Sequence, residues 1–572
     1  MRAPEVHLSV PSRFYLLTVV LVVACLQPAC EQFEVTDFYH HGVVASVSPI
    51  ASDYGRDVLA RGGNAFDAAV GTALALAVVY PQAGNLGGGG FAVIRDGKSG
   101  QVLSLDFRET APLSASENMF LDESGGVREG ASTNGALSAG VPGSVAGLYE
   151  LWKAYGSLPW ESLVNPIAHL ADSGFVVDSF LAADFKSHAT ELDGLPDTRK
   201  LYAPDGSYPK AGDRLVLKDL GQTLFEIGRD GPLAFYSGTI AEAIVGTCAE
   251  HGGLITNADL ETYRPIWRQP VSFTFDSLTV FSMGPPSSGG VIVGQILKLL
   301  EPYDLGRFTS GSPEYIHLFC EAARLAFADR SVHLGDPDFY NVPSTLLDST
   351  YLGRRRLNMS ATKAGVSSEI GAGSPPVHES DQTTHISVCD SAGNIVSLTT
   401  TINSSFGSKL VVAGAGFLLN NEMDDFSIKP GYPNQYGLVG SEANKIEPGK
   451  RMLSSMSPTV ITVKGRPFLV LGSPGGSKII TTVASAIINF SRFGLSAGET
   501  VAAPRFHHQW LPDEIVLEEG GFSSSVVKRL EAMGHTVVTR KPFCDLQLIY
   551  ISPLGLMTGA SDPRNGGRAV GY

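Results

Sequence analysis

The sequence predicts a mixed α+β fold in which stacked β-sheets are covered by helices. Antiparallel hairpins are expected at residues 91–107, 381–402 and 459–471, where β-prone residues flank turns that contain glycine. Apolar helices are expected between and after them, at residues 67–79 and 479–490. Sheets and helices of this kind each hide an apolar face, so they stabilise one another when they stack in layers.

Length and composition describe a globular protein rich in turns. The chain has 572 residues, including 64 Gly and 34 Pro, and 43% of its residues are hydrophobic. That length is enough for about two to four domains of average size. The net charge of −15 argues against nucleic acid or an anionic membrane surface as the main partner. The six cysteines form no CxxC pair and no metal-ligand spacing, so they predict no metal site.

The N-terminus has the pattern of a targeting signal. Residues 14–26 are almost wholly apolar, which is short for a membrane span of roughly 17–25 residues but suits the core of a signal peptide. We therefore expect residues 1–30 to be a signal peptide or an N-terminal anchor. Export to the periplasm or the extracellular space follows from either. Residues 22–25 also resemble a bacterial lipoprotein cleavage box, which would make Cys25 a lipid anchor.

The first elements after this signal are a strand and two helices. The strand is expected at residues 42–47, and the helices at residues 51–61 and 67–79. A glycine-rich segment follows at residues 84–90. It lacks the Gly-Lys-Ser/Thr ending of a phosphate loop, and no acidic residue stands where a dinucleotide fold would place one. We interpret it as a place where backbones pack closely.

Helical patterns dominate the middle of the chain. Residues 271–281 alternate like one strand, and residues 314–332 have the pattern of an amphipathic helix. Ser287 and Ser288 precede an apolar helix and have no His or acid nearby in the sequence. A helix-capping role is therefore expected for them rather than a catalytic one. The other helices of this part are expected at residues 141–155, 160–173, 217–228 and 238–251.

The candidate site is organised around residues 381–390. These ten residues alone favour an ordinary strand in an uncut hairpin. If the peptide bond between Gln382 and Thr383 were cut, Thr383 would begin a new chain, with a free α-amino group beside its hydroxyl. That amine has a pKa of roughly 7.7–8.0, so it accepts the hydroxyl proton near neutral pH. A threonine paired with its own amine is an activated nucleophile.

Four later segments alter the interpretation of this stretch. Together with it, they closely resemble the γ-glutamyltransferase family (γ-glutamyl transpeptidases), especially its bacterial members, and they lie at residues 399–407, 419–427, 448–459 and 472–477. The resemblance extends from about residue 42 to residue 572. It implies the four-layer αββα sandwich of N-terminal-nucleophile hydrolases. It also implies autocatalytic cleavage into a large subunit, residues 31–382, and a small catalytic subunit, residues 383–572, which together form the fold.

The resemblance assigns roles residue by residue. Thr383 would be the nucleophile for self-cleavage and for turnover, and Thr401 would hydrogen-bond to it. The backbone N–H groups of Gly475 and Gly476 would form the oxyanion hole, where no side chain blocks close approach. Six further residues would bind the substrate: Asn403, Glu422 and Asp425 its α-amino group, and Arg108, Ser454 and Ser455 its α-carboxylate.

For three of the expected binding residues, the sequence allows more than one role. Sequence alone favours an ion pair between Arg108 and Glu109, whereas the family motif implies a bidentate clamp on the substrate carboxylate. Glu422 stands where some bacterial members carry Gln, and a carboxylate there still suits an ammonium group. Residues 430–440 match the lid loop of bacterial-type members, with Tyr436 as its gate; the alternative for Tyr436 is a packing role.

The implied activity is transfer and hydrolysis of γ-glutamyl groups. Glutathione and related γ-glutamyl compounds would be the donors, and amino acids, dipeptides or water the acceptors. No metal or organic cofactor is implied. The close rival is an acylase of the cephalosporin-acylase type acting on glutaryl amides, which lack the α-amino group. A catalytically inactive, unprocessed scaffold is a rival of a different class. An unrelated serine hydrolase is the weakest of the rivals.

Overall fold

Two antiparallel sheets organise the chain from Tyr39 onward. The structure, a computed structural model, describes residues 37–370, 383–429, 432, 434–435 and 440–572. The larger sheet has seven strands in the order β18-β1-β9-β10-β2-β3-β6, and the smaller has six in the order β17-β16-β12-β11-β8-β7. The strands of the larger sheet are β1 (Gly42–Ser46), β2 (Gly89–Arg95), β3 (Val102–Phe107), β6 (Ile266–Arg268), β9 (Thr384–Asp390), β10 (Ile395–Thr401) and β18 (Arg568–Gly571). Those of the smaller are β7 (Val271–Phe275), β8 (Leu278–Ser282), β11 (Thr459–Val463), β12 (Arg466–Gly472), β16 (Gln547–Ile551) and β17 (Met557–Ser561).

The alternation of side chains along the strands of the larger sheet separates two hydrophobic cores. On β1, Val44 belongs to one core, while its neighbours Val43 and Ala45 belong to the other. On β2, Ala92 and Ile94 likewise face one core. Because side chains of a strand alternate between faces, each core lies on its own side of the sheet. One core is covered by helices, and the other is shared with the smaller sheet.

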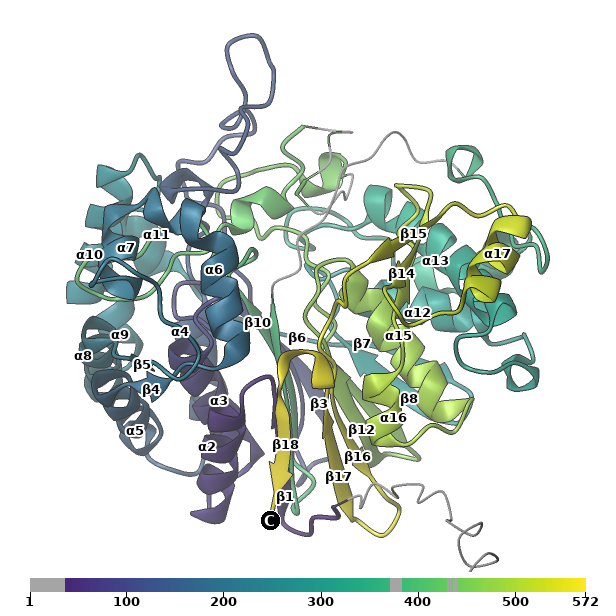
Figure 1. Ribbon diagram of the computed structural model, residues 1–572, viewed down its shortest axis with the longest axis horizontal. Coiled ribbons are helices and arrows are strands. Elements are labelled where there is room, and N and C mark those ends of the chain that lie inside the picture. The colour runs from purple at the N-terminus through teal and green to yellow at the C-terminus, as the bar shows by residue number, and fades with distance from the viewer. Residues whose placement is uncertain (1–36, 371–382, 430–431, 433, 436–439) are drawn as a thin grey trace, which may run out of the picture. The chain divides into compact units, whose positions relative to one another are not determined.

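Helices close both outer faces (Figure 1). The first group packs on the larger sheet and includes α2 (Pro49–Ala60), α3 (Ala65–Val79), α4 (Ser144–Tyr155), α5 (Trp160–Ser173) and α8 (Lys218–Asp230). The second group packs with the smaller sheet and includes α12 (Gly289–Leu300), α13 (Pro313–His333) and α15 (Lys478–Ser491). This helix–sheet–sheet–helix order confirms the expected αββα fold.

Shorter elements complete the two outer layers. The remaining helices are α6 (Ser179–Asp193), α7 (Pro196–Tyr202), α9 (Pro232–Tyr236), α10 (Thr239–Glu250), α11 (Asn257–Thr262), α14 (Ser349–Arg356), α16 (Ala497–Ala502) and α17 (Ser524–Ala532). Two small sheets are formed by β4 (Phe175–Val176) with β5 (Arg214–Leu215), and by β13 (Phe506–His507), β14 (Ile515–Glu518) and β15 (Val537–Arg540). The sequence had predicted α5 with its observed ends.

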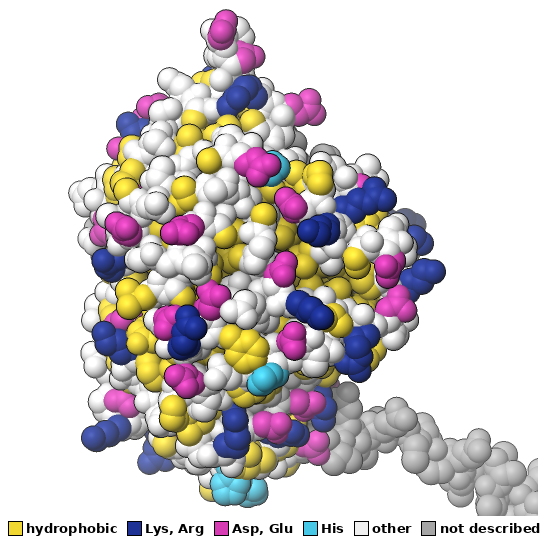
Figure 2. Space-filling model, turned by 90° about the vertical axis from the view of Figure 1, so that its left-hand side faces the viewer, with side chains coloured by type: hydrophobic (Ala, Val, Ile, Leu, Met, Phe, Trp, Pro, Cys, Tyr) yellow, Lys and Arg dark blue, Asp and Glu magenta, His cyan; other side chains and the backbone are white. Residues whose placement is uncertain are grey.

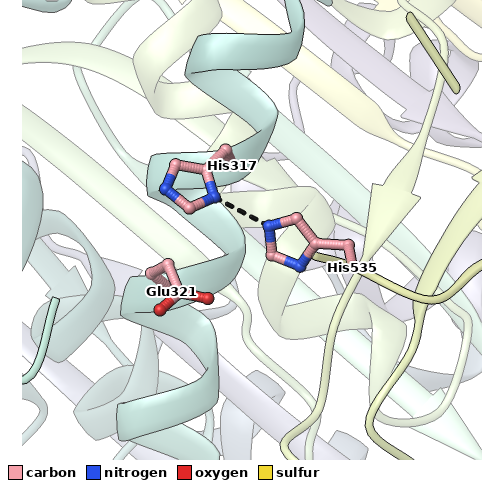
Figure 3. A group of neighbouring side chains, drawn as sticks. All are labelled: His317, Glu321 and His535. Atoms are coloured by element: carbon pink, nitrogen blue, oxygen red, sulfur yellow. Dashed lines mark hydrogen bonds between the residues drawn. The ribbon is translucent and has the colours of Figure 1, made fainter. Parts of the chain in front are cut away.

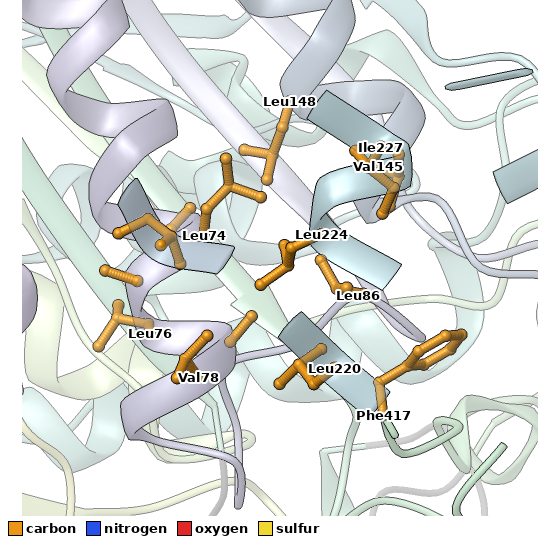
Figure 4. Close-up of a cluster of buried hydrophobic side chains, with 14 of the residues drawn as sticks. Leu74, Leu76, Val78, Leu86, Val145, Leu148, Leu220, Leu224, Ile227 and Phe417 are labelled. Carbon is orange, nitrogen blue, oxygen red and sulfur yellow. The ribbon is translucent and has the colours of Figure 1, made fainter. Parts of the chain in front are cut away.

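The core under the first helical layer is built from side chains that lie far apart in the sequence. Leu74 of α3 and Leu224 of α8 belong to the same cluster as Leu86, which lies within the glycine-rich segment, and Phe417 (Figure 4). The fifteen residues of α3 are all buried. The nearly continuous apolar sequence of this helix therefore reflects burial on every side, as its pattern predicted.

The glycine-rich segment packs backbone against backbone, as expected. A Cβ atom on Gly88 would lie 2.1 Å from the Thr401 carbonyl oxygen, and one on Gly90 would lie 2.3 Å from the Thr399 carbonyl oxygen. Asn85 then ties the segment to the same strand by donating to the Thr401 carbonyl at 2.9 Å. The segment thus holds the end of β10 in place.

Two expectations about single elements were wrong. The alternating run 271–281 is a hairpin, β7 and β8, because Asp276 adopts a left-handed conformation with φ +53° and reverses the chain. The helix at 314–332 is not amphipathic. Every residue of α13 from Tyr315 to Arg330 is buried, including His317 and Glu321.

The polar residues of α13 are buried because they have buried partners. His317 Nε2 lies 2.8 Å from the Ser360 carbonyl, which only accepts, so this nitrogen carries the proton. His317 Nδ1 lies within hydrogen-bonding distance of His535 Nε2, at 2.7 Å (Figure 3). Glu321 accepts from the Gly365 amide at 3.0 Å. The cluster ties residues on both sides of the Thr383 position into one layer.

On the face that Figure 2 shows, acidic and basic side chains are interspersed and form no basic patch. Within the described ranges, no helix has both the length and the apolar character needed to cross a membrane. The predicted signal segment, residues 1–30, lies outside the described residues.

Candidate active site

Thr383 stands immediately before β9 and is buried, with 6% of its surface exposed. The strand pairs with β10, so that Thr384 faces Thr400 and the neighbouring Thr401 ends the partner strand beside the nucleophile position. Just inside the strand, His385 Nδ1 lies 2.8 Å from Thr399 Oγ1. Burial lowers the pKa of this histidine to about 3, so it is a neutral core residue rather than an acid or base.

A pocket with about 330 Å³ of empty space lies beside Thr383. It brings together nine residues that the sequence singled out: Thr383, Thr401, Arg108, Asn403, Glu422, Asp425, Ser454, Ser455 and Gly476. They come from the ends of β3 and β10, from the turn Glu422–Asp425, from the segment before β11, and from the turn that begins α15. Residues more than 300 positions apart in the chain therefore meet at one end of the sheets.

Arg108 is the electrostatic centre of this pocket and is 1% exposed. Its Nη1 lies 2.8 Å from Glu422 Oε2, and its Nη2 pairs with Asp425. Glu109 is also near, at 3.6 Å from Nη1. The ion pair with Glu109 expected from sequence alone is thus one of three, and the two acids predicted to bind the substrate's α-amino group are the closer partners.

The carboxylates of Glu109, Glu422 and Asp425 all pair with the same cation, Arg108. Burial raises the pKa of Glu422 well above its ordinary value, and it raises that of Glu109 to about 7. Burial also raises the pKa of Asp425, although the nearby Arg108 cation opposes this rise. Among the described residues, neither carboxylate oxygen of Glu422 accepts a hydrogen bond of good geometry. An ammonium group would therefore find an acceptor there.

Asn403 is held in a strained backbone conformation at the rim of this pocket. Its φ is +72°, and its side chain donates to the Asn421 carbonyl at 3.0 Å. The backbone N–H of Asn403 also donates to Thr401 Oγ1 at 2.8 Å. That bond fixes the orientation of the Thr401 hydroxyl, the group expected to assist the nucleophile.

The two predicted serines lie against a second arginine that sequence reasoning missed. Arg330, on α13, is 5% exposed and lines the same pocket. Its Nη2 donates to Ser455 Oγ at 3.2 Å, and its Nε donates to Ser288 Oγ at 2.9 Å. Ser288 Oγ in turn donates to the Ser454 carbonyl at 2.7 Å. Ser288 therefore positions the binding segment, where only a helix cap was expected.

The paired glycines line two hollows that both border Thr383. Gly476 lines the pocket described above, whereas Gly475 lines an adjoining cleft, and Thr383 borders both. Their φ angles are +130° for Gly475 and +55° for Gly476, conformations that an L side chain rarely adopts. The turn thus requires glycine at both positions, which fits the expected oxyanion hole. Two other predicted residues, Gln382 and Tyr436, lie outside the described residues.

A threonine at the start of a central strand, two stacked sheets between helical layers, and a polar pocket at the end of the sheets together define an N-terminal-nucleophile hydrolase. Comparison with known sequences identifies one family within this class. The Gamma-glutamyltranspeptidase family profile matches residues 51–572, and the chain belongs to this family.

The names of individual proteins that are similar to this chain agree with the family assignment. The chain is 46% identical over 526 residues to the glutathione hydrolase proenzyme of Escherichia coli (strain K12), covering 92% of this chain and 90% of that protein. Among solved structures it resembles the γ-glutamyltranspeptidase of Helicobacter pylori, at 41% identity and a TM-score of 0.56, over 57% of this chain and 94% of that one. It also resembles the cephalosporin acylase of Bacillus halodurans, at 26% identity and a TM-score of 0.81, over 94% of this chain and 97% of that one.

Proposed function

We propose that this protein is the precursor of a γ-glutamyl hydrolase and transferase with Thr383 as its nucleophile. It cleaves the γ-glutamyl amide bond of glutathione and related compounds and passes the acyl group to water or to the amine of an amino acid or dipeptide. The observation that carries the proposal is the pairing of Arg108 with Glu422 and Asp425 in one pocket beside Thr383. The name of the Escherichia coli relative supports both the substrate and the existence of a precursor.

The pocket complements the zwitterionic head of a γ-glutamyl donor. Arg108 and the hydroxyls of Ser454 and Ser455 receive the α-carboxylate, and Glu422 and Asp425 receive the α-ammonium together with Asn403. The donor's carboxylate takes the place of Glu422 and Asp425 on Arg108, and its ammonium takes the place of Arg108 beside the two acids, so each of these side chains keeps an opposite partner when the donor binds. The γ-carbonyl then extends from the head toward Thr383.

Turnover uses the hydroxyl and the α-amine of Thr383. The amine accepts the hydroxyl proton as the oxygen attacks the γ-carbonyl, and the charge that develops on the carbonyl oxygen is stabilised by the N–H groups of Gly475 and Gly476. The donor's amine leaves with the proton, and an ester to Thr383 remains. Water or an acceptor amine then attacks this ester and releases the glutamyl group.

The same hydroxyl processes the precursor. Thr383 attacks the carbonyl of Gln382, the acyl group moves from nitrogen to oxygen, and water hydrolyses the resulting ester. The products are a large subunit of residues 31–382 and a small subunit of residues 383–572, which remain together because β9 of the small subunit lies between strands of the larger sheet, next to β1. Export of the protein and a lid role for Tyr436 are further parts of the proposal.

An acylase acting on glutaryl amides is the second candidate, since the solved cephalosporin acylase shares the fold. A glutaryl group has a carboxylate but no ammonium. It would draw Arg108 away from Glu422 and Asp425 and bring no ammonium to replace the guanidinium, which is costly for the buried Glu422 carboxylate. The two carboxylates therefore favour the γ-glutamyl donor.

Mass spectrometry and N-terminal sequencing of the purified protein test the proposal, with Thr383→Ala as the control. We expect two fragments, the smaller beginning Thr-Thr-His-Ile-Ser, and an uncut Thr383→Ala chain. The processed protein should then hydrolyse γ-glutamyl-p-nitroanilide faster than glutaryl-p-nitroanilide. A folded, uncut wild-type chain would contradict the nucleophile, and equal rates on the two anilides would contradict the donor.

A further inference from the structure

Two histidines and a glutamate meet beside α13, and none of them lines the pocket at Thr383 (Figure 3). His317 and Glu321 stand four positions apart on this helix, which places them on one face. His535 faces them from the turn between α17 and β15, 218 positions after His317 in the chain. All three are buried, and one ligand atom from each lies within 4.8 Å of the other two. The reaction proposed above uses none of them.

The contacts of His317 leave one of its ring nitrogens available as a ligand. Its Nε2 lies 2.8 Å from the Ser360 carbonyl, so in the neutral ring the proton is on Nε2 and the lone pair is on Nδ1. This Nδ1 lies 2.7 Å from His535 Nε2, and the two rings are tilted by 64° rather than stacked. A bond from the other ring N–H to a backbone carbonyl is the contact that orients metal-ligating histidines.

Glu321 supplies a carboxylate that is already held from two sides. Its Oε2 accepts from the Gly365 amide at 3.0 Å, and its Oε1 lies 3.2 Å from Arg324 Nη2. Arg324 also pairs with Asp513, so the guanidinium keeps a carboxylate partner when Glu321 turns a lone pair toward a metal ion. These three charged side chains leave one negative charge in excess beside the imidazoles, which favours a bound cation.

The donor atoms suit Zn²⁺ better than Ca²⁺ or Mg²⁺. Two imidazole nitrogens and one carboxylate oxygen are ligands that zinc accepts, with water in the fourth position, whereas calcium and magnesium prefer a shell of oxygen atoms. A tetrahedral Zn²⁺ holds imidazole nitrogens about 2.0–2.1 Å away, so its ligand atoms lie about 3.3 Å from one another. The two ring nitrogens must therefore separate by about 0.6 Å when the ion enters.

We propose that His317, Glu321 and His535 form a structural zinc site. Both imidazoles bind as neutral ligands, so the proton of His535 resides on Nδ1 while its Nε2 coordinates the ion. The site itself is independent of the proposed function. Its second role rests on that function: after cleavage between Gln382 and Thr383, two ligands belong to the large subunit and His535 belongs to the small one. The ion then bridges the two subunits.

Binding of zinc should stabilise the folded chain. The unfolded chain does not bring the three ligands together, so zinc binding is coupled to folding. A zinc concentration of 100 times Kd should shift the unfolding equilibrium about 100-fold toward the folded state. Because the Ser360 carbonyl and the Gly365 amide contact two of the ligands, the ion should also fasten residues 360–365 to α13.

Zinc content and thermal unfolding of the full chain test the site. The protein is purified without a histidine tag or chelator from cells grown with added ZnSO4. We expect about one zinc per chain by elemental mass spectrometry, in the processed protein and also in the Thr383→Ala chain. Added ZnCl2 should raise the melting temperature of protein from which zinc was removed, and CaCl2 at the same concentration should not.

His535→Gln and Glu321→Gln each remove one ligand. Loss of a direct ligand should lower zinc affinity at least as much as the roughly 10–100-fold that loss of an outer partner costs. The matched control is His251→Gln, which removes an exposed imidazole after α10 and should bind zinc like the wild type.

Three results would overturn the inference. The first is a folded wild-type chain with no zinc and no response to ZnCl2, which would leave only a hydrogen-bonded cluster, whether or not the variants fold. The second is unchanged zinc content in folded His535→Gln and Glu321→Gln chains. The third is an equal stabilisation by CaCl2. An uncut wild-type chain that binds zinc would support the site and contradict the proposed function together with the bridging role.

Discussion

Replacing Glu422 with Gln separates the two tasks that the structure gives to this residue. Glu422 is a partner of Arg108 at 2.8 Å, and in the proposed function it accepts from the donor's ammonium. The substitution keeps the shape of the side chain and removes its charge. Its effects on stability and on donor binding should have opposite signs.

The stability effect follows from the local charge count. Arg108 faces three carboxylates within 4 Å, so removing one of them still leaves the guanidinium with Glu109 and Asp425. A charge-assisted contact is lost, but a buried charge is removed, and repulsion from the two remaining acids disappears. We therefore expect the variant to be as stable as the wild type or more stable.

The binding effect follows from the strength of the lost contact. A hydrogen bond to a charged acceptor contributes about 1.5–3 kcal/mol and a neutral one about 0.5–1.5 kcal/mol. The difference of about 1–1.5 kcal/mol corresponds to a KM for the donor that is about 5–10-fold higher. Since Glu422 contacts the donor head and not the reacting carbonyl, kcat should stay nearly constant.

Steady-state hydrolysis of γ-glutamyl-p-nitroanilide and thermal unfolding measure the two effects. Asp424→Asn is the control. Asp424 is the neighbouring buried acid of the same turn, but it bonds to Ser132 and does not line the pocket. A Glu422→Gln enzyme with an unchanged donor KM, or with a melting temperature several degrees below that of the wild type, would refute the reasoning.

Three other substitutions or conditions test the remaining parts of the site. Arg330→Gln removes a cation and the bond to Ser455, so the donor KM should rise about ten-fold with little change in kcat; an unchanged KM would remove Arg330 from the binding set. In Gly475→Ala the new Cβ would lie 2.3 Å from Cys544 Sγ, so kcat should fall about 10²-fold or more, whereas Gly246→Ala, with open space around it, should be silent. Burial also holds the pKa of three histidines at about 3, against about 6.5 when unfolded: His385, His508 and His535. Their contribution to stability is therefore complete above about pH 6.5 and is lost as the pH falls toward 3, so the melting temperature should drop less between pH 7 and 5 in His535→Gln than in the wild type.

Much of the fold could be predicted because local pattern and burial agree. The hairpin β11–β12 and the helices α5 and α15 appear where alternation or an apolar run places them. The hairpin at 271–282 was mistaken for one strand because alternating residues lie on both sides of Asp276 and Ser277, although these two adjacent polar residues shift the phase of the alternation. That shift in phase marks the point where the chain reverses.

The helix α13 shows the limit of such patterns most clearly. Its charged residues look like a solvated face, yet Arg330 reaches the substrate pocket and Glu321 accepts a buried backbone amide. A charged residue that pairs with a buried partner cannot be distinguished, from the sequence alone, from one that is exposed to water. The partners come from other segments of the chain, so only the folded arrangement distinguishes the two cases.

The residues of the donor pocket could be named from sequence, but their relation to one another could not. The motif assigned Arg108 to the α-carboxylate and Glu422 to the α-amino group of the donor's head, and the structure brings the two side chains into direct contact. Under the proposed function, this contact would make the pocket selective by charge balance. A donor with both a carboxylate and an ammonium replaces each ion pair with another, while a group that carries only the carboxylate breaks the pairs with Arg108 and offers no ammonium in return. Discrimination between γ-glutamyl and glutaryl groups therefore depends on the acids that Arg108 already holds, and it should weaken in Glu422→Gln for that reason.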